Sequence, residues 1–195
     1  RELPSGEGPN ALETPYEVEW GRVVDGKPQP LDPTGETLHV RDPVYVQVTN
    51  KGSDAIYFSL FDIGLSAKIT LLTTSEPSGI ELEGDGDAYV FGAREPMGLT
   101  GIKLGWAEGV PRENPQYESL LVIVSDRPQD LRSLEARGMR DAFADAAPKS
   151  PLQQVMGQIT QGGTRDLGSE NEIEADIRYA ITRLDFLVSP SPRPA

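Results

Sequence analysis

The sequence predicts a mainly β protein, an Ig-like antiparallel β-sandwich with one helix and one long flexible insert. Between residues 16 and 125, apolar and polar side chains alternate in a series of short segments, as half-buried strands require. Turn residues separate these segments about every 8–12 residues, a spacing typical of β-sandwiches and barrels. No helical pattern interrupts the series, so a parallel α/β sheet is not expected.

The composition divides the chain into an arm, one domain and a tail. Residues 1–15 are rich in Pro, Gly and Glu, which predicts a linker or arm. Residues 16–188 carry the strand pattern and are expected to form a single β-sandwich domain. Residues 189–195 make a Pro-rich tail.

The first strand is predicted over residues 16–24, where aromatic and aliphatic side chains alternate with acids. Asp25-Gly26 then supply a turn. Residues 28–33 contain three prolines and are expected to be a connector. A short strand is expected after it, ending at Pro43.

The strongest alternation lies on either side of the polar turn at residues 50–54. Residues 44–49 and residues 55–63 each form a long amphipathic run. Two strands joined by a short Gly-containing loop predict a β-hairpin. Further strands are expected at residues 69–72, 80–82, 88–91, 102–106 and 117–124.

After residue 125 the pattern becomes helical. Asp126 is a candidate N-cap, Pro128 stands in the first turn, and later apolar residues fall on one face. These features predict a helix over residues 127–145. Residues 146–172 are polar and rich in Gly and Pro, which predicts the most mobile internal loop.

The last element fits two patterns. Ser169 and Glu172 fit a capping box before a helix with an apolar face. Apolar residues also alternate from about Asp176, and residues 184–188 resume that alternation one residue out of phase, as a bulge would produce. We favour a strand, which would close a sheet edge beside the first strand.

Composition excludes several functional classes. The 31 acids and 18 bases give a formal net charge of −13, which argues against nucleic acid as a partner. With no cysteine, the chain has no disulfide, thiolate metal site or cysteine nucleophile, and with one histidine it lacks a three-histidine zinc site. No apolar run reaches the ~18 residues of a membrane-spanning helix. The absence of cysteine is compatible with the cytoplasm, which we favour.

The acidic residues Glu81, Glu83, Asp85 and Asp87 form a candidate calcium loop, because hard cations bind several carboxylate oxygens. The spacing does not fit an EF-hand, however, since Tyr89 stands at one ligand position. Asp-Gly is first a turn signal, so a solvated β-turn is the favoured interpretation.

Catalytic candidates are weak. His39 and Asp42 lie close in sequence, but the chain has no G-x-S-x-G elbow for a serine hydrolase. Trp20, Trp106 and Tyr57 fit a ligand groove, although at strand spacing a core role is favoured. A glycosidase needs two carboxyl groups ~5–9 Å apart, which sequence alone does not reveal. No catalytic, cofactor-binding or metal residue is therefore predicted.

Three segments carry a family resemblance. Val44–Asn50, Ser53–Ile63 and Lys68–Leu72 resemble an uncharacterised β-rich domain family of bacteria and fungi. In that family the motif n-x-s-d precedes a strand rich in aromatic residues. A turn and a further strand with the motif G-k-v-t-x-L-x-P follow. Residues 96–104 and 120–131 are similar to the last part of the family's domain. There a GP-x-G-x-E motif is followed by a strand and a helix with the pattern i-a-T-x-x-p-x-d-l.

Domains of this family, similar here over about residues 36–136, commonly sit C-terminal to caspase-like cysteine peptidase domains and sometimes beside protein kinase domains. The resemblance implies a non-catalytic accessory or interaction domain of a caspase-like cysteine peptidase. Its expected partners are proteins, either the peptidase domain of the same polypeptide or a regulatory protein. The alternative is an extracellular carbohydrate- or calcium-dependent binding module, which the acidic loop and the tryptophans would serve.

Overall fold

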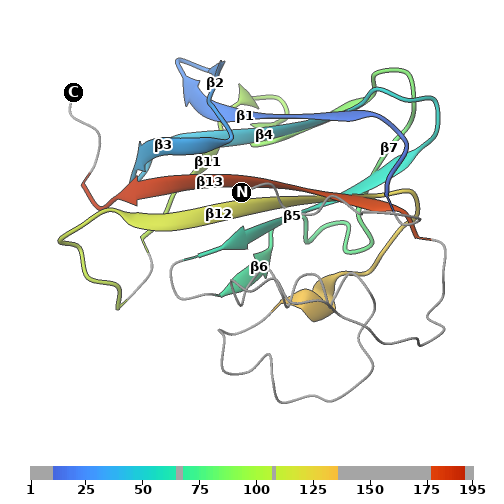
Figure 1. Ribbon diagram of the computed structural model, residues 1–195. Coiled ribbons are helices and arrows are strands. Elements are labelled where there is room, and N and C mark those ends of the chain that lie inside the picture. The colour runs from blue at the N-terminus through green and yellow to red at the C-terminus, as the bar shows by residue number, and fades with distance from the viewer. Residues whose placement is uncertain (1–10, 65–67, 107–108, 136–176, 192–195) are drawn as a thin grey trace, which may run out of the picture.

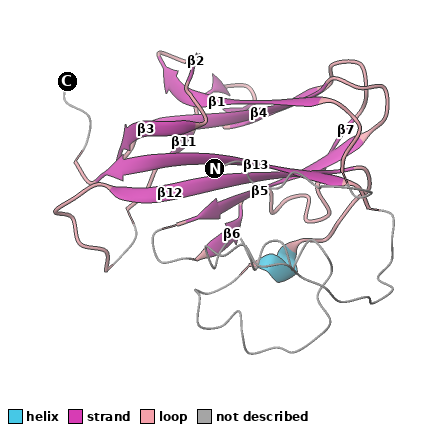
Figure 2. Ribbon diagram, in the orientation of Figure 1, coloured by secondary structure: helices cyan, strands magenta, loops and turns pink. Residues whose placement is uncertain are grey.

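The computed structural model describes residues 11–64, 68–106, 109–135 and 177–191. This part of the chain is mainly β, with two sheets packed face to face (Figures 1 and 2). The predicted mainly β class with antiparallel sheets is therefore confirmed. In the described residues, no helix is long and apolar enough to cross a membrane.

The first sheet, called sheet 1, has the strand order β10-β9-β8-β4-β1-β2, and β11 also pairs with β4. Its pairs are antiparallel except for the short β8–β9 pair. Its strands are β1 (Tyr16–Val24), β2 (Lys27–Pro30), β4 (Pro43–Asn50), β8 (Ala88–Phe91), β9 (Ala93–Arg94), β10 (Gly98–Leu99) and β11 (Ile102–Lys103).

The second sheet, called sheet 2, has the strand order β3-β13-β12-β5-β6, and β7 also pairs with β5. The β13–β3 pair is parallel and the others are antiparallel. Its strands are β3 (Thr34–His39), β5 (Ile56–Ile63), β6 (Ile69–Leu71), β7 (Ile80–Leu82), β12 (Gln116–Ser125) and β13 (Tyr179–Ser189).

The central part of sheet 2 is buried on both faces. Even-numbered residues of β12, such as Leu120 and Val122, belong to the core between the sheets. Odd-numbered residues, such as Leu121 and Ile123, belong to a second cluster that includes Leu131. This double burial explains why residues 120–124 are apolar without alternation, because neither face of this part of β12 meets water.

Strand β13 confirms that the last element is a strand, but the predicted bulge is wrong. Its pairing with β12 is continuous from Tyr179 to Val188. Tyr179 and Ile181 point into the second cluster, whereas Phe186 and Val188 point into the core between the sheets. The change of phase in the sequence is therefore a change of buried face. The register shift of β13 lies instead in its pairing with β3.

The predicted pairing of the last strand with the first is also wrong. Strand β13 lies between β12 and β3 in sheet 2, while β1 belongs to sheet 1. The two strands face one another across the core, where the Tyr16 hydroxyl and Thr182 Oγ1 are 3.1 Å apart. The rings of Trp20 and Phe186 pack at 5.2 Å between centroids. The amphipathic pattern of β1 and β13 reflects a core that both strands cover, not a shared sheet edge.

The predicted hairpin at residues 50–54 is wrong, because β4 and β5 belong to different sheets. The fully buried Asn50 holds the crossover between them. Its Oδ1 accepts a hydrogen bond from the Gly52 N–H at 2.9 Å. Its Nδ2 donates to three backbone carbonyl oxygens, those of Asp54 (2.8 Å), Leu82 (3.1 Å) and Glu83 (2.9 Å).

The predicted Pro-rich connector begins as an edge strand, β2. Proline is tolerated there because an edge strand leaves some N–H positions unpaired. The chain then passes to sheet 2, held by two bonds to Trp20. Leu31 N–H donates to the Trp20 carbonyl at 3.0 Å, and Trp20 Nε1 donates to the Asp32 carbonyl at 2.9 Å.

The predicted helix over residues 127–145 is wrong in its described part. Only a 3-10 turn, η2 (Arg132–Leu134), occurs before residue 136. The expected cap, Asp126, accepts a hydrogen bond from the Arg178 N–H at 3.0 Å, and Gln129 N–H donates to the Ser78 carbonyl. These partners tie the segment to the residues that precede β13 and β7. Residues 136–145, the segment 146–172 for which a loop is predicted, and the ends at 1–10 and 192–195 lie outside the described residues.

We predict that Asn50→Ala lowers the free energy of unfolding by about 2–4 kcal/mol, because it leaves several buried backbone groups without partners. Urea denaturation followed by circular dichroism measures the change. The matched control is Asn114→Ala at an exposed position, where a change below about 0.5 kcal/mol is expected. Equal effects of the two substitutions would contradict the role given to Asn50.

Candidate functional site

A hollow of about 210 Å³ lies where β5 and β12 of sheet 2 face β4 and β11 of sheet 1. We call it the inter-sheet cleft; Figure 1 shows these strands in the two layers. Its walls are mainly apolar, while Asp62, Lys103 and Glu118 supply charge. The apolar lining residues are Val44, Val46, Leu60, Leu72, Phe91, Ile102, Leu104 and Leu120.

Strand register brings two of these charged side chains together. Asp62 of β5 lies opposite Leu120 of β12, so Glu118, two residues along, is its diagonal neighbour on the same face. Alternation along each strand points both carboxyl groups the same way as Leu60 and Leu120, toward sheet 1. Two acids thus occupy positions that belong to the core pattern.

Partial burial makes these two carboxyl groups unusual. Desolvation, then the charge of Asp62 and a hydrogen bond to it, raise the pKa of Glu118 to about 8. Desolvation also raises the pKa of Asp62, opposed by its hydrogen bond with Glu118 and by the charge of Lys68. At neutral pH, Glu118 therefore keeps its proton and donates it to ionised Asp62, so that the pair carries about one negative charge.

The pair retains hydrogen-bonding capacity. The buried Asp62 Oδ1 has no hydrogen-bond partner among the described residues. Lys68 and Lys103 are exposed, and no ion pair within 4.0 Å between described residues includes either of them. The cleft therefore offers an acceptor that a donor brought by a ligand would satisfy.

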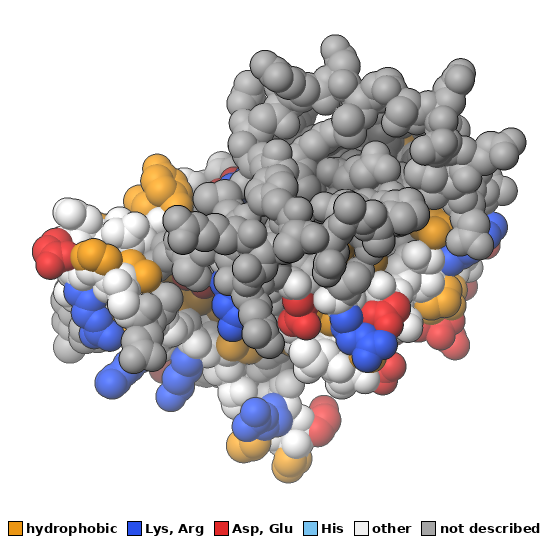
Figure 3. All heavy atoms as spheres, turned by 90° about the horizontal axis from the view of Figure 1, so that it is seen from below, with side chains coloured by type: hydrophobic (Ala, Val, Ile, Leu, Met, Phe, Trp, Pro, Cys, Tyr) orange, Lys and Arg blue, Asp and Glu red, His pale blue; other side chains and the backbone are white. Residues whose placement is uncertain are grey.

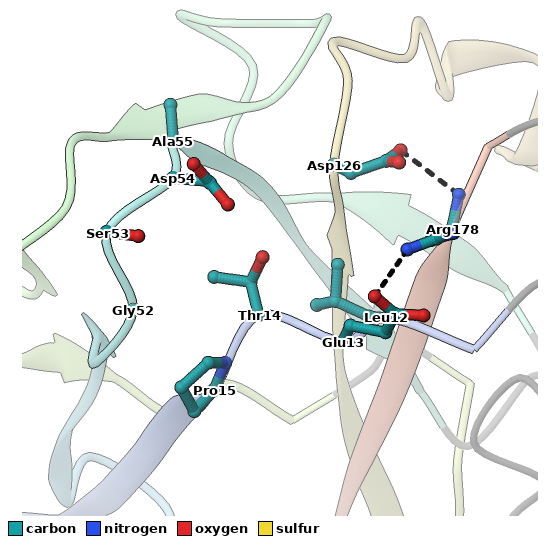
Figure 4. A pocket seen from close by; sticks show the side chains of 10 residues that line it. All are labelled: Leu12, Glu13, Thr14, Pro15, Gly52, Ser53, Asp54, Ala55, Asp126 and Arg178. Carbon is teal, nitrogen blue, oxygen red and sulfur yellow. Dashed lines mark hydrogen bonds and ion pairs between the residues drawn. The ribbon is translucent and has the colours of Figure 1, made fainter.

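A second hollow, the polar pocket, lies at the opposite end of β12 and has a volume of about 330 Å³ (Figure 4). On one side of it lies the crossover segment, residues 52–55. On the other side the guanidinium group of Arg178 forms an ion pair with Glu13 at 2.6 Å. The backbone N–H of Arg178 donates a hydrogen bond to Asp126 at 3.0 Å. Because the guanidinium is already paired, this pocket has less to offer a ligand than the inter-sheet cleft.

The acidic loop at residues 81–87 uses carboxylates within the fold. Asp87 accepts hydrogen bonds from the N–H groups of Glu83 and Ala88, both at 2.9 Å. Glu81 accepts one from the Tyr57 hydroxyl at 2.9 Å. In the described part of the chain, no group of three or more His, Asp or Glu side chains is arranged to hold a metal ion.

The other sequence candidates do not form one site. His39 lies at the end of β3, where its N–H donates to Asp42 at 2.9 Å and its Nδ1 lies 3.0 Å from the Ser191 carbonyl oxygen. Trp20 is buried in the core, and Trp106 Nε1 donates to the Val110 carbonyl at 3.0 Å. The Tyr57 hydroxyl donates to Glu81 of the acidic loop, and none of the three aromatic residues lines the inter-sheet cleft or the polar pocket.

Sequence reasoning missed Asp62 and Glu118. The available signal was parity: each acid stands two residues from a core leucine, at an inward position of an alternating strand. Among 31 acids that signal was not distinctive without the strand register.

No protein-family model matches this chain, and comparison with curated proteins and with solved structures gives no significant match. The cleft, its carboxyl pair and the charge of the chain therefore carry the functional conclusion.

We predict that the Glu118 carboxyl makes stability fall as pH rises. A carboxyl whose pKa is raised by folding binds more protons in the folded chain, so its contribution is full below the unfolded pKa and is lost as pH rises through the folded pKa. For Glu118 this window runs from 4.5 to about 8. Glu118→Gln should therefore gain about 1–3 kcal/mol relative to wild type between pH 5 and pH 9, after allowance for solvent screening.

Urea denaturation at several pH values measures this difference. Glu113→Gln is the matched control, since Glu113 is exposed, and its curve should follow that of wild type. If the difference between wild type and Glu118→Gln stays constant from pH 5 to pH 9, the shared proton is refuted.

Proposed function

We propose that this chain is an Ig-like β-sandwich that acts as a non-catalytic accessory domain and binds protein partners. The observation that carries the proposal is the size and lining of the inter-sheet cleft. Small-molecule sites commonly occupy about 300–1,000 Å³. A mainly apolar hollow of about 210 Å³ with one polar wall better suits a side chain inserted by another protein.

The carboxyl pair supports binding over hydrolysis. Hydrolases that use two carboxyl groups need room for substrate between or beside them. Here Asp62 and Glu118 are bonded to one another, and the cleft that they share is narrow. We therefore assign no catalytic residue to this chain.

Charge supports a protein partner with basic character. The net charge of −13 favours encounter with basic surfaces and repels acidic ones. Figure 3 shows the molecule from below the view of Figure 1, and where described residues are visible, acidic, basic and apolar side chains are interspersed. Because the described part of that surface carries charges of both signs, we expect the acidic groups of the cleft to contribute more to the choice of partner than this surface does.

The link to a caspase-like cysteine peptidase rests on the resemblance of residues 36–136. On this proposal the catalytic Cys and His belong to another part of the polypeptide, and the present domain binds or positions the peptidase domain or a regulatory protein. The alternative, an extracellular carbohydrate- or calcium-dependent module, has less support. Trp20 is buried, and Asp87 of the acidic loop accepts hydrogen bonds from the backbone N–H groups of Glu83 and Ala88.

We predict that this chain associates with the remainder of the polypeptide encoded in the same reading frame. Calorimetry with the two purified parts should give a dissociation constant that weakens several-fold between about 50 and 500 mM NaCl, because salt screens the acidic domain. Absence of association at either salt concentration, or a reading frame without a caspase-like domain, would contradict the accessory role. A large rise of the thermal midpoint with micromolar calcium would favour the alternative.

A further inference from the structure

The inter-sheet cleft has apolar walls and an acidic part. Side chains of Leu60, Leu72 and Leu104 are among its apolar walls, and Asp62 and Glu118 supply its acidic part. A ligand that matches both parts has an apolar stem and a head that donates hydrogen bonds. Long basic side chains have this structure, since their methylene stems pack on apolar surface while the head stays polar.

The hydrogen-bonding groups of the carboxyl pair favour a ligand that donates hydrogen bonds. A carboxylate oxygen only accepts, and one shared proton satisfies few of the acceptor sites that two carboxyl groups offer. Asp62 Oδ1 is buried without a partner in the described structure. A neutral apolar side chain would leave that oxygen unpaired, whereas a cationic donor would pair it.

The charged groups in and beside the cleft come from four segments. They are Asp62 of β5, Glu118 of β12, Lys68 just before β6 and Lys103 of β11. Both lysines are exposed, so water screens their charge. A cation seated directly against the carboxyl groups would interact more strongly, because the local dielectric constant there is lower.

We propose that the inter-sheet cleft is a receptor for a single arginine side chain of the partner protein. The guanidinium group pairs with Asp62 and Glu118, and the methylene stem packs against the leucines of the cleft wall. The inference rests on the proposed function, which it deepens by naming the chemistry of the partner.

Arginine fits this site better than lysine. Its planar guanidinium presents five N–H donors in a fixed fork that matches carboxylate groups, and it is less strongly hydrated than an ammonium group. Paired carboxyl groups with an unsatisfied oxygen offer several acceptors in one place. An ammonium group would bond fewer of them and would give up more hydration.

Binding and protonation are linked. A guanidinium beside Glu118 favours the ionised carboxylate, so binding releases a proton at neutral pH. Because the pKa of Glu118 is about 8 in the free protein, affinity should rise with pH between 6 and 8. The guanidinium group itself remains charged over this range, so it does not produce the same dependence.

The test uses n-butylguanidinium as a probe of the arginine side chain on the full chain. Methyl NMR spectra should shift at Leu60, Leu72 and Leu104, with a dissociation constant in the millimolar range expected for so small a ligand. Affinity should rise about tenfold from pH 6 to pH 8. Neutral n-butylurea, which has nearly the same shape, should bind at least about tenfold more weakly.

Variants separate the pair from the cleft wall. Asp62→Asn and Glu118→Gln should each weaken the probe about tenfold or more, whereas Glu113→Gln should leave its affinity unchanged. Thermal midpoints identify a variant that fails to fold, and the pH dependence in the wild-type protein tests the proposal without any substitution.

Three outcomes would overturn the proposal: no shift of the cleft methyl groups at about 100 mM probe, equal binding of n-butylurea, or tighter binding of n-butylammonium, which would indicate lysine. If the cleft ignores the probe while the chain still binds the rest of its polypeptide, the inference fails and the proposed function stands. If probe binding succeeds without that association, the cleft is a receptor for a different partner.

Discussion

The buried amide of Asn50 holds the step on which the rest of this fold depends, the passage of the chain from sheet 1 to sheet 2. Four hydrogen bonds of its side chain tie the end of β4 to the crossover turn and to the segment after β7. Because β5 then enters the opposite sheet, its inward residues face β4 across the core. Asp62 reaches the inter-sheet cleft only through this arrangement, since a β4–β5 hairpin would place β5 beside β4.

The sequence was sufficient to predict which segments are strands. Alternation identified residues 16–24 and 44–49, and an apolar run identified residues 117–124; these segments lie close to the observed β1, β4 and β12. Alternation did not identify partners, because it reports which side of a strand is buried and not what covers it. The predicted hairpin and the predicted β1–β13 edge failed for this reason. The out-of-phase pattern in β13 has the same origin, since Tyr179 and Ile181 are buried on one face of the strand and Phe186 and Val188 on the other.

The site was hidden for a related reason. Asp62 and Glu118 could each be recognised as an acid in phase with core leucines, but they are 56 residues apart in sequence and meet through the β5–β12 register. Their low solvation and mutual bond are tertiary properties. The helix predicted from Asp126 failed similarly, because Arg178, distant in sequence, bonds the side chain that local pattern assigned to a cap.

The role proposed for the inter-sheet cleft depends on two carboxyl groups that share one proton between the sheets. Carbon-13 NMR of the full chain, with the side-chain carboxyl carbons of Asp62 and Glu118 assigned, follows their titration directly. We expect Glu118 to titrate with a midpoint near pH 8 and the midpoint of Asp62 to lie above its ordinary value. Independent titration of both groups near about pH 4, the range of solvated carboxyl groups, would contradict it.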